Sequence, residues 1–258
     1  MTVRDKVTIR QYRHPEDFEH VRRVFVAATM QGRGSPILDG MTYYAPPKRL
    51  TRAVATFILC LEGTAISQRM RDAIPLSLRM VRWVQGLLGF SLLARWIYLW
   101  YQRRKVQRMF RIFLEEALAG ELGDIVHSFD LRVGEGGECV PTGAGGFWVA
   151  EAAGEVAGLV GLTNHKDPTI GDIHRLAVAP NHQRKGVAEM LMNALISHAR
   201  AHNIRDLDLV TSDHNKSALR FYGRMGWKIV TRKYYHGLML AVMRRRIGDS
   251  EFDRRIGG

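Results

Sequence analysis

Hydrophobic and polar residues alternate at the start of the chain and then recur at helical spacing. Residues 6–13, KVTIRQYR, alternate as a strand does. Residues 14–32 have helical periodicity, with proline and acidic residues in the first turn and a glycine just after the end. A strand followed by a helix is therefore predicted. Residues 32–47 are rich in glycine, proline and tyrosine, which predicts a loop.

A long apolar region comes next. Residues 50–66 predict a helix, and residues 83–101 form a 19-residue stretch in which Arg95 is the only charged residue. A helix of that length can cross about 30 Å of hydrocarbon, although an arginine near its centre costs roughly 2.5–3.5 kcal/mol. Aromatic residues at its end precede the basic run 103–105, as in an interfacial belt. We expect membrane association, with spanning, re-entrant and flat arrangements left open; a helix in a soluble core is the alternative.

The remaining pattern returns to short elements. Residues 106–122 predict another helix, and the glycine-rich residues 135–146 predict a flexible turn, because their order fits neither a GxGxxG motif nor a P-loop. From residue 146 onward, strands and helices follow one another regularly. The predicted order is a hairpin at 147–165 turning at Ala153-Gly154, a strand at 172–180, a helix at 186–203, a strand at 206–212, a helix at 215–226 and a strand pair at 227–246.

The helix predicted at 186–203 is amphipathic. Its apolar residues recur at helical spacing, which predicts one buried face. The residues expected on that face are Val187, Met190, Leu191, Ala194 and Leu195.

Composition adds a strong positive charge to this picture. The chain has 258 residues, 46% of them hydrophobic, which suffices for a folded core. Its formal net charge is +13, and such a balance indicates a phosphate-bearing partner. Basic residues concentrate at 69–82 and 103–111, on both sides of the apolar stretch, so a membrane surface is favoured and no nucleic-acid partner is expected.

The cysteines and the N-terminal residues bear on metal binding and on the cellular compartment. Cys60 and Cys139 are far apart and have no metal-binding spacing, so we expect no metal site. A reducing compartment is the default expectation, and a single disulfide bridge is the alternative. The first residues lack the apolar core of a cleavable signal.

One segment between a predicted strand and a predicted helix has the chemistry of an anion site. It comprises Gln183, Arg184, Lys185, Gly186, Val187 and Ala188. The first turn of a helix exposes unpaired N–H groups with a partial positive charge, and a glycine lets a ligand approach the backbone closely. Two neighbouring cations add to the attraction, so a pyrophosphate is the expected ligand.

This segment resembles the Q/R-x-x-G-x-G/A motif of the GNAT superfamily, the acyl-CoA N-acyltransferases. Asn215, Ala218, Tyr222 and Gly226 match a second motif of that family at the usual distance. Ala188 replaces the last glycine of the first motif, as in many members. The resemblance covers residues 8–28 and 146–244, and it implies a mixed, mostly antiparallel sheet flanked by helices, an α/β (α+β) fold that binds acetyl-CoA.

The apolar insertion after the first helix carries a finer resemblance. Its position, together with FWVAE at residues 147–151, is similar to the membrane-associated group that includes the cysteine-conjugate and aspartate N-acetyltransferases. We accordingly divide the chain into residues 1–31, the first strand and helix of the core; 32–122, a helical and membrane-associated insertion; 123–247, the core with the coenzyme A site; and 248–258, a tail.

The resemblance also implies roles for individual residues. Backbone groups of Leu176 and Val178 would face the cofactor, with the Val178 N–H polarising the thioester carbonyl and Leu176 binding the pantetheine arm. Asn215 would contact that arm or cap a helix, and both are compatible. Tyr222 matches the position of the family's frequent general acid; a core aromatic is the alternative.

Two residues are candidates for the base. Asp172 and His174 lie two positions apart on one predicted strand, so their side chains share a face. Asp172 matches the place of a catalytic glutamate in several relatives, and histidine titrates near neutral pH. Either can act directly or through water, and a solvent-exposed role for both is the alternative.

The acceptor is the least defined part of the prediction. An acidic acceptor needs a nearby cation, for which Arg10, Arg13, Arg175 and Arg232 are candidates, although each also suits a solvated surface. We expect an acetyl-CoA-dependent N-acetyltransferase that acts on a small-molecule amine or amino-acid derivative. The expected location is an internal membrane such as the endoplasmic reticulum, or the cytoplasm if the apolar insertion only forms part of a protein core. A protein lysine or N-terminal acetyltransferase and an inactive basic lipid- or nucleic-acid-binding module are the alternatives; no oligomeric state is predicted.

Overall fold

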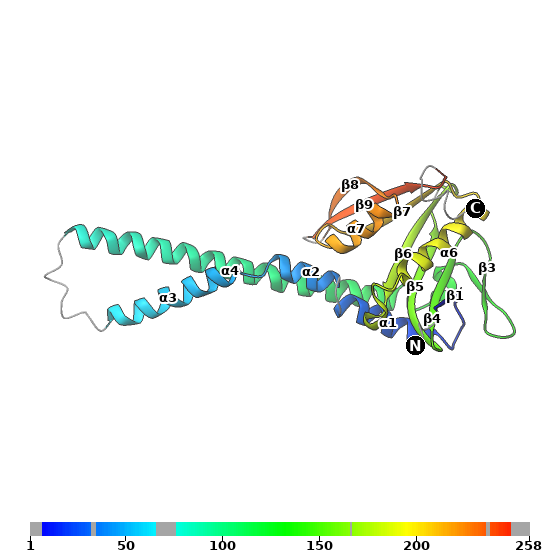
Figure 1. Ribbon diagram of the computed structural model, residues 1–258, viewed down its shortest axis with the longest axis horizontal. Helices are drawn as coiled ribbons and strands as arrows, with labels where there is room; N and C mark the ends of the chain where they lie inside the picture. The colour runs from blue at the N-terminus through cyan, green and yellow to red at the C-terminus, as the bar shows by residue number, and fades with distance from the viewer. Residues whose placement is uncertain (1–6, 32–34, 66–75, 166, 236–237, 249–258) are drawn as a thin grey trace, which may run out of the picture. The chain divides into compact units, whose positions relative to one another are not determined.

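The computed structural model describes residues 7–31, 35–65, 76–165, 167–235 and 238–248 (Figure 1). Its contacts divide the chain into two units, one of Met1–Asp39 with Met109–Gly258 and one of Gly40–Arg108. The described elements are, in chain order, β1 (Thr8–Gln11), α1 (Phe18–Met30), α2 (Pro36–Tyr43), α3 (Lys48–Ala65), α4 (Leu76–Ala119), α5 (Ile125–Ser128), β2 (Leu131–Val133), β3 (Cys139–Pro141), β4 (Gly146–Ala152), β5 (Glu155–Asn164), β6 (Ile170–Val178), η2 (Pro180–His182), α6 (Val187–Ala201), β7 (Asp206–Ser212), α7 (Lys216–Arg224), β8 (Lys228–Tyr235) and β9 (Leu238–Arg246).

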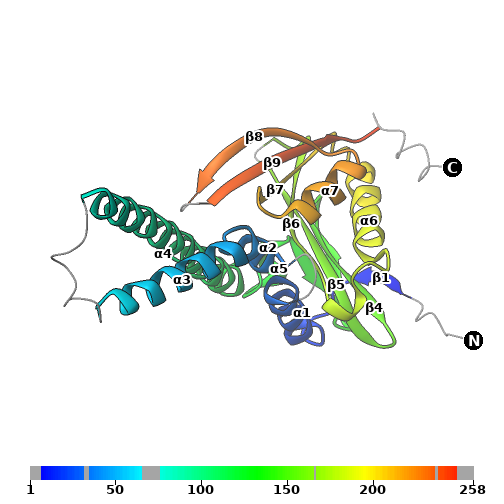
Figure 2. The ribbon, with the colours of Figure 1, turned by 60° about the vertical axis from the view of Figure 1, so that its left-hand side comes forward.

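A seven-stranded sheet forms the first unit. Its strand order is β1-β4-β5-β6-β7-β9-β8, and every neighbouring pair is antiparallel except β6 and β7, which are parallel. Helix α1 packs on one face of the sheet and α6 on the other (Figure 2). The predicted fold class, a mostly antiparallel mixed sheet flanked by helices with a helical insertion after the first helix, is confirmed.

Each face of the sheet has its own apolar core. Leu191, Leu195 and Ile196 of α6 are fully buried against one face. Val21 and Phe25 of α1 belong to the core on the other face. The amphipathic pattern of α6 was therefore predicted correctly except at Met190, which is 37% exposed. Met192, Ile196 and Ala199 are buried instead, so the buried face of α6 is centred away from Met190.

The hairpin between β4 and β5 turns where it was predicted. Ala153 and Gly154 have φ values of 51° and 81°. Positive φ at both central residues is typical of the two-residue turns whose twist matches that of paired strands. Glycine adopts this conformation without strain, which explains its place at the second position.

Three local predictions were wrong. The predicted loop at 32–47 contains helix α2, which begins at Pro36, a residue suited to the first turn of a helix. The apolar stretch and the following run form one helix, α4, because neither proline nor glycine interrupts residues 90–119. The glycine-rich turn at 135–146 contains β3, whose Cys139 pairs with Val133 of β2.

The second unit contains α3 and the first part of α4. Gly89 is buried where Phe57 of α3 meets α4, and a Cβ at position 89 would lie 2.0 Å from the Phe57 ring. A glycine is therefore required for this close approach. Among the helices of the described residues, none combines the length and apolarity needed to cross a membrane.

Candidate active site

A cleft opens where β6 and β7 part. The two strands pair only over Ile170–Ile173 and Asp206–Leu209. Beyond that point β6 stays with β5 and β7 stays with β9. A bulge in β6 accompanies the separation, because Arg175 and Leu176 together lie opposite the single β5 residue Val160. Arg175 itself has a φ of 56°.

The cleft belongs to a cavity of about 1400 Å³ within the first unit. The cavity brings together every predicted site residue except Lys185, which is exposed and does not line it. The predicted residues on its walls are Asp172, His174, Leu176, Val178, Gln183, Arg184, Gly186, Val187, Ala188, Asn215 and Tyr222. Residues from β6, α6 and α7 thus converge as expected, while their individual roles stay predictions.

The segment that precedes α6 is shaped for close approach to its backbone. Gly186 is the N-cap residue of the helix, with a φ of 86°, and a Cβ built there would meet nothing within 4 Å. Arg184 is also left-handed, with a φ of 63°. The open space at Gly186 and the first-turn N–H groups of a 15-residue helix fit the pyrophosphate of coenzyme A.

The edge of β6 offers a second polar surface. Ala179 donates its N–H to Ala157 of β5 at 2.8 Å. Because successive N–H groups in a strand point to opposite sides, the N–H of Val178 faces away from β5 and toward the cleft. Gln183 donates from Nε2 to the Val178 carbonyl oxygen at 3.3 Å, which ties the helix-preceding segment to this strand edge.

Asn215 and Tyr222 lie on the α7 side of the cavity. The Oδ1 atom of Asn215 accepts from the N–H of Ala218 at 3.0 Å and from Oγ of Ser217 at 2.8 Å, so Asn215 caps α7. Tyr222 packs beside the rings of Phe221 and Trp227. Burial raises the pKa of Tyr222 to about 12, so its hydroxyl keeps its proton at neutral pH and is able to donate it.

Comparison with known proteins identifies the family to which this chain is similar. The model of the acetyltransferase (GNAT) family matches residues 107–227. Human N-acetyltransferase 8B is 29% identical over 204 residues, which cover 76% of this chain and 79% of the human protein. Mouse N-acetyltransferase 8B is 28% identical over 236 residues, which cover 89% of this chain and 85% of the mouse protein. The chain belongs to the GNAT superfamily of N-acetyltransferases.

The fold comparison agrees with this assignment. The crystal structure of a GNAT-family acetyltransferase from Staphylococcus aureus covers 93% of this chain and 99% of its own, with a TM-score of 0.51 and 12% identity. This likeness concerns the fold, and the predicted family is confirmed by the family model and the sequence relatives. Acetyl-CoA is the cosubstrate of that family. Within the described ranges, no group of three or more histidine, cysteine or acidic residues is placed to hold a metal ion.

The two candidate bases of this acetyltransferase differ in their surroundings. His174 places Nδ1 3.2 Å from Oε1 of Glu121, and both side chains are about 30% exposed. Asp172 pairs in register with Asp208 of β7. Arg244 binds the side chain of Asp208, whereas the side chain of Asp172 forms no hydrogen bond or ion pair among the described residues.

Sequence reasoning missed Glu121. Burial alone would raise its pKa, but hydrogen bonds from His174 and Arg175 outweigh that effect and lower the pKa to about 2. Arg175 contributes through Nε, 2.9 Å from Oε2. Glu121 follows the end of α4, and no motif or spacing links it to a strand more than fifty positions later, so no sequence signal identified it.

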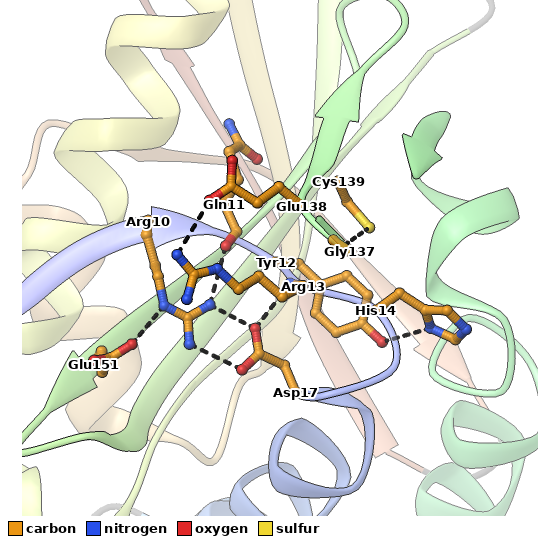
Figure 3. Close-up of polar contacts among 10 residues, drawn as sticks. All are labelled: Arg10, Gln11, Tyr12, Arg13, His14, Asp17, Gly137, Glu138, Cys139 and Glu151. Carbon is orange, nitrogen blue, oxygen red and sulfur yellow. Dashed lines mark hydrogen bonds and ion pairs between the residues drawn. The ribbon is translucent and has the colours of Figure 1, made fainter. Parts of the chain in front are cut away.

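The arginines predicted for an acidic acceptor are engaged elsewhere. Arg10 binds Asp17 and Glu151, and Arg13 binds Glu138, all around the start of α1 (Figure 3). Arg232 binds Asp213 at 3.1 Å. Neither Arg10, Arg13 nor Arg232 lines the cavity, and Arg175, which does, is bound to Glu121.

The arginine cluster at the start of α1 has a structural effect that can be measured. Asp17 is 4% exposed and accepts from both Nη atoms of Arg10, at 2.6 and 2.9 Å, and from the N–H of Arg13 at 2.8 Å. Asp17→Ala leaves Arg10 paired only with Glu151 and removes the acceptor of the Arg13 N–H, so we expect a loss of about 1–3 kcal/mol in the free energy of unfolding. Urea titration measures this loss. The control, Glu16→Ala at the exposed neighbouring position, should change stability by less than about 0.5 kcal/mol. Equal stabilities for the two variants would show that the Asp17 contacts do not stabilise the fold.

Proposed function

We propose that this acetyltransferase transfers the acetyl group of acetyl-CoA directly to the amine of a small molecule bound in the cavity. One observation carries the proposal: a single cavity extends from the left-handed Gly186 at the start of α6, past the Val178 edge of β6, to His174 and Asp172. The residues proposed as anion site, backbone donor and proton acceptor thus lie along one cleft. Acetyl-CoA, when bound, supplies the acetyl group as a thioester.

The segment before α6 is proposed to hold the cosubstrate. N–H groups of the first turn after Gly186, together with the cation of Arg184, suit the charge of a pyrophosphate. Asn215, already the cap of α7, lines the same cavity from the opposite side and is proposed to contact the pantetheine arm. Lys185 is proposed to contribute only through the electrostatic field, since it lies outside the cavity wall.

The chemistry then requires three groups of the chain. The N–H of Val178 is proposed to stabilise negative charge as it develops on the carbonyl oxygen under attack. His174 or Asp172 accepts a proton from the attacking amine, and the hydroxyl of Tyr222 donates a proton to the departing sulfur. These transfers leave a neutral amide and a neutral thiol as products.

The walls of the acceptor side indicate what kind of amine fits. Phe25, Phe110, Ile112 and Phe113 give this part of the cavity an apolar wall. Arg175, which lines the cavity beside these residues, is bound to Glu121, so it is not available to pair with a carboxylate on the acceptor. An amine with an apolar arm therefore has more support than an acidic amino acid.

A second part of the proposal concerns the membrane. Residues 40–108 contain 12 lysines and arginines and only two acidic residues, so this unit carries +10 of the net charge of +13. In α4, nine large apolar side chains between Trp83 and Tyr101 are exposed. Exposed aromatics beside a dense positive charge are typical of a surface that binds anionic lipid. We propose that this unit attaches the enzyme to an internal membrane such as the endoplasmic reticulum.

Vesicle binding tests the membrane proposal. Replacing Trp83, Leu87 and Phe90, which are 68–73% exposed, with serine removes apolar area from that surface. Burial of each such side chain contributes about 1.5–3 kcal/mol, so the partition coefficient should fall by about 100-fold or more. Sedimentation with phosphatidylserine-containing vesicles measures the effect, with Val140→Ser, an exposed apolar residue of the other unit, as the control. Unchanged binding of the triple variant would remove this surface as the attachment site.

Thiol release from acetyl-CoA tests the proposed activity. The purified protein is incubated with acetyl-CoA and, in turn, arylalkylamines, alkylamines, polyamines, cysteine S-conjugates, aspartate and lysine peptides. We expect the fastest release with an amine that has an apolar arm. A clear preference for lysine peptides would replace the small-molecule proposal by a protein acceptor, and release that no amine accelerates would refute amine acetylation.

A further inference from the structure

Glu121 uses both of its carboxylate oxygens to hold two consecutive residues of β6. Oε1 lies 3.2 Å from Nδ1 of His174, and Oε2 lies 2.9 Å from Nε of Arg175. All three side chains line the cavity. Consecutive residues of a regular strand point to opposite faces, so one carboxylate reaches both only because of the bulge at Arg175.

Arg175 is itself fixed, which fixes Glu121 in turn. Its guanidinium carbon lies 5.6 Å from the ring centroid of Phe25 and 5.0 Å from that of Phe113, and its side chain is 15% exposed. Stacking on two aromatic rings restricts the guanidinium to one orientation. The left-handed backbone of Arg175, with a φ of 56°, is a strained conformation for a residue other than glycine, and such strain is typical of functional sites.

Glu121 is unsuited to accept the amine proton. Although burial opposes it, the pair of hydrogen bonds lowers the pKa of Glu121 to about 2, which makes the carboxylate a very weak base. It acts instead as an acceptor for a neighbouring donor. The hydrogen bond at one ring nitrogen of a histidine determines which nitrogen carries the proton.

We infer that Glu121 is a positioning residue that keeps Nδ1 of His174 protonated, so that Nε2 is the atom that receives the amine proton. The inference rests on the proposed acetyl transfer and selects His174 over Asp172 as the base. When the amine attacks, its proton moves to Nε2, while the Nδ1 proton stays in the hydrogen bond to Glu121. The positive charge that forms on the imidazole is then balanced by the Glu121 carboxylate.

The tautomer of His174 tests this inference without any variant. Long-range ¹H–¹⁵N spectra of the full chain, recorded above pH 8 and assigned with His174→Gln, distinguish the two neutral forms of the ring. We expect the Nδ1-protonated form in the wild type and a shift to the Nε2-protonated form in Glu121→Ala. The Nε2-protonated form in the wild type would overturn the inference.

Kinetics give the second test. Glu121→Ala should lower kcat by about 10- to 100-fold, part of what general base catalysis contributes, and leave the KM for acetyl-CoA unchanged. Glu121→Gln retains an oxygen that accepts from Nδ1, so it should recover part of the loss. Glu115→Gln, at an exposed position of α4 outside the cavity wall, is the control.

The outcomes separate this inference from the proposed function. A wild type that acetylates no amine overturns the proposed function and, with it, the role of a base. Normal turnover in a folded Glu121→Ala variant overturns the inference alone. Should Glu121→Ala fail to fold, the wild-type tautomer and the Glu121→Gln rate decide the same question.

Discussion

Replacing Gly186 with valine is expected to weaken coenzyme A binding by about 100-fold or more, because each charge-assisted hydrogen bond contributes about 1.5–3 kcal/mol and 1.4 kcal/mol corresponds to tenfold. The φ of 86° at Gly186 is unfavourable for any residue with a Cβ, and most of all for a β-branched one. The valine side chain would also project into the open space through which, as we propose, a phosphate reaches the N–H groups of α6. Isothermal titration calorimetry with coenzyme A measures the loss.

A matched control separates backbone strain from the loss of a binding surface. Gly154 has a φ of 81° and equally open surroundings, but it lies in the β4–β5 turn and does not line the cavity. Gly154→Val should cost about 1–2 kcal/mol of stability, as strain predicts, and leave the affinity for coenzyme A unchanged. If Gly186→Val binds coenzyme A as tightly as Gly154→Val does, this segment is not the pyrophosphate site.

The Tyr222→Phe variant is expected to show the second large effect, a drop in kcat of about 10²- to 10⁴-fold, the range of general acid catalysis. Removing only the hydroxyl preserves the ring contacts with Phe221 and Trp227, so α7 should keep its place. Stability and the affinity for acetyl-CoA should therefore change little. Steady-state rates with a saturating amine measure the effect.

The matched control for Tyr222 is Tyr234→Phe, which removes a hydroxyl from an exposed residue of β8 outside the cavity. Its turnover should equal that of the wild type. The acid role also makes a prediction about pH. Burial raises the pKa of Tyr222 from its ordinary value of 10 to about 12, so the acid stays protonated and activity should not decline through its ionisation between pH 8 and pH 10. Unchanged turnover in Tyr222→Phe would remove Tyr222 as the acid.

Local sequence patterns were sufficient to predict most of the sheet and the residues that form one wall of the cavity. Alternation and turn chemistry identified the hairpin at Ala153-Gly154, and helical periodicity identified α6, because both signals arise from neighbouring residues. The segment that includes Gly186 was identified for the same reason. Helix α4 was divided wrongly because a change in composition after Tyr101 resembles an end, although no residue there stops a helix.

The acceptor side was much less predictable. Glu121 reaches His174 and Arg175 only after α4 and the sheet have packed, so its role depends on contacts between distant parts of the chain. The same packing engages Arg10 and Arg13 with acidic partners, which no local pattern indicated. Charge composition alone therefore overestimated the cations available to bind a substrate.

Mass spectrometry of the acceptor tests the central claim most directly. The full chain is incubated with acetyl-CoA that carries ¹³C in its acetyl group and with the best amine from the thiol-release panel, beside the Gly186→Val and Tyr222→Phe variants. Direct transfer in this cavity predicts a ¹³C-acetyl amide on the amine in the wild type, formed in proportion to the thiol released, and little or none with either variant. Thiol release without a labelled amide, or equal labelling by all three proteins, would contradict it.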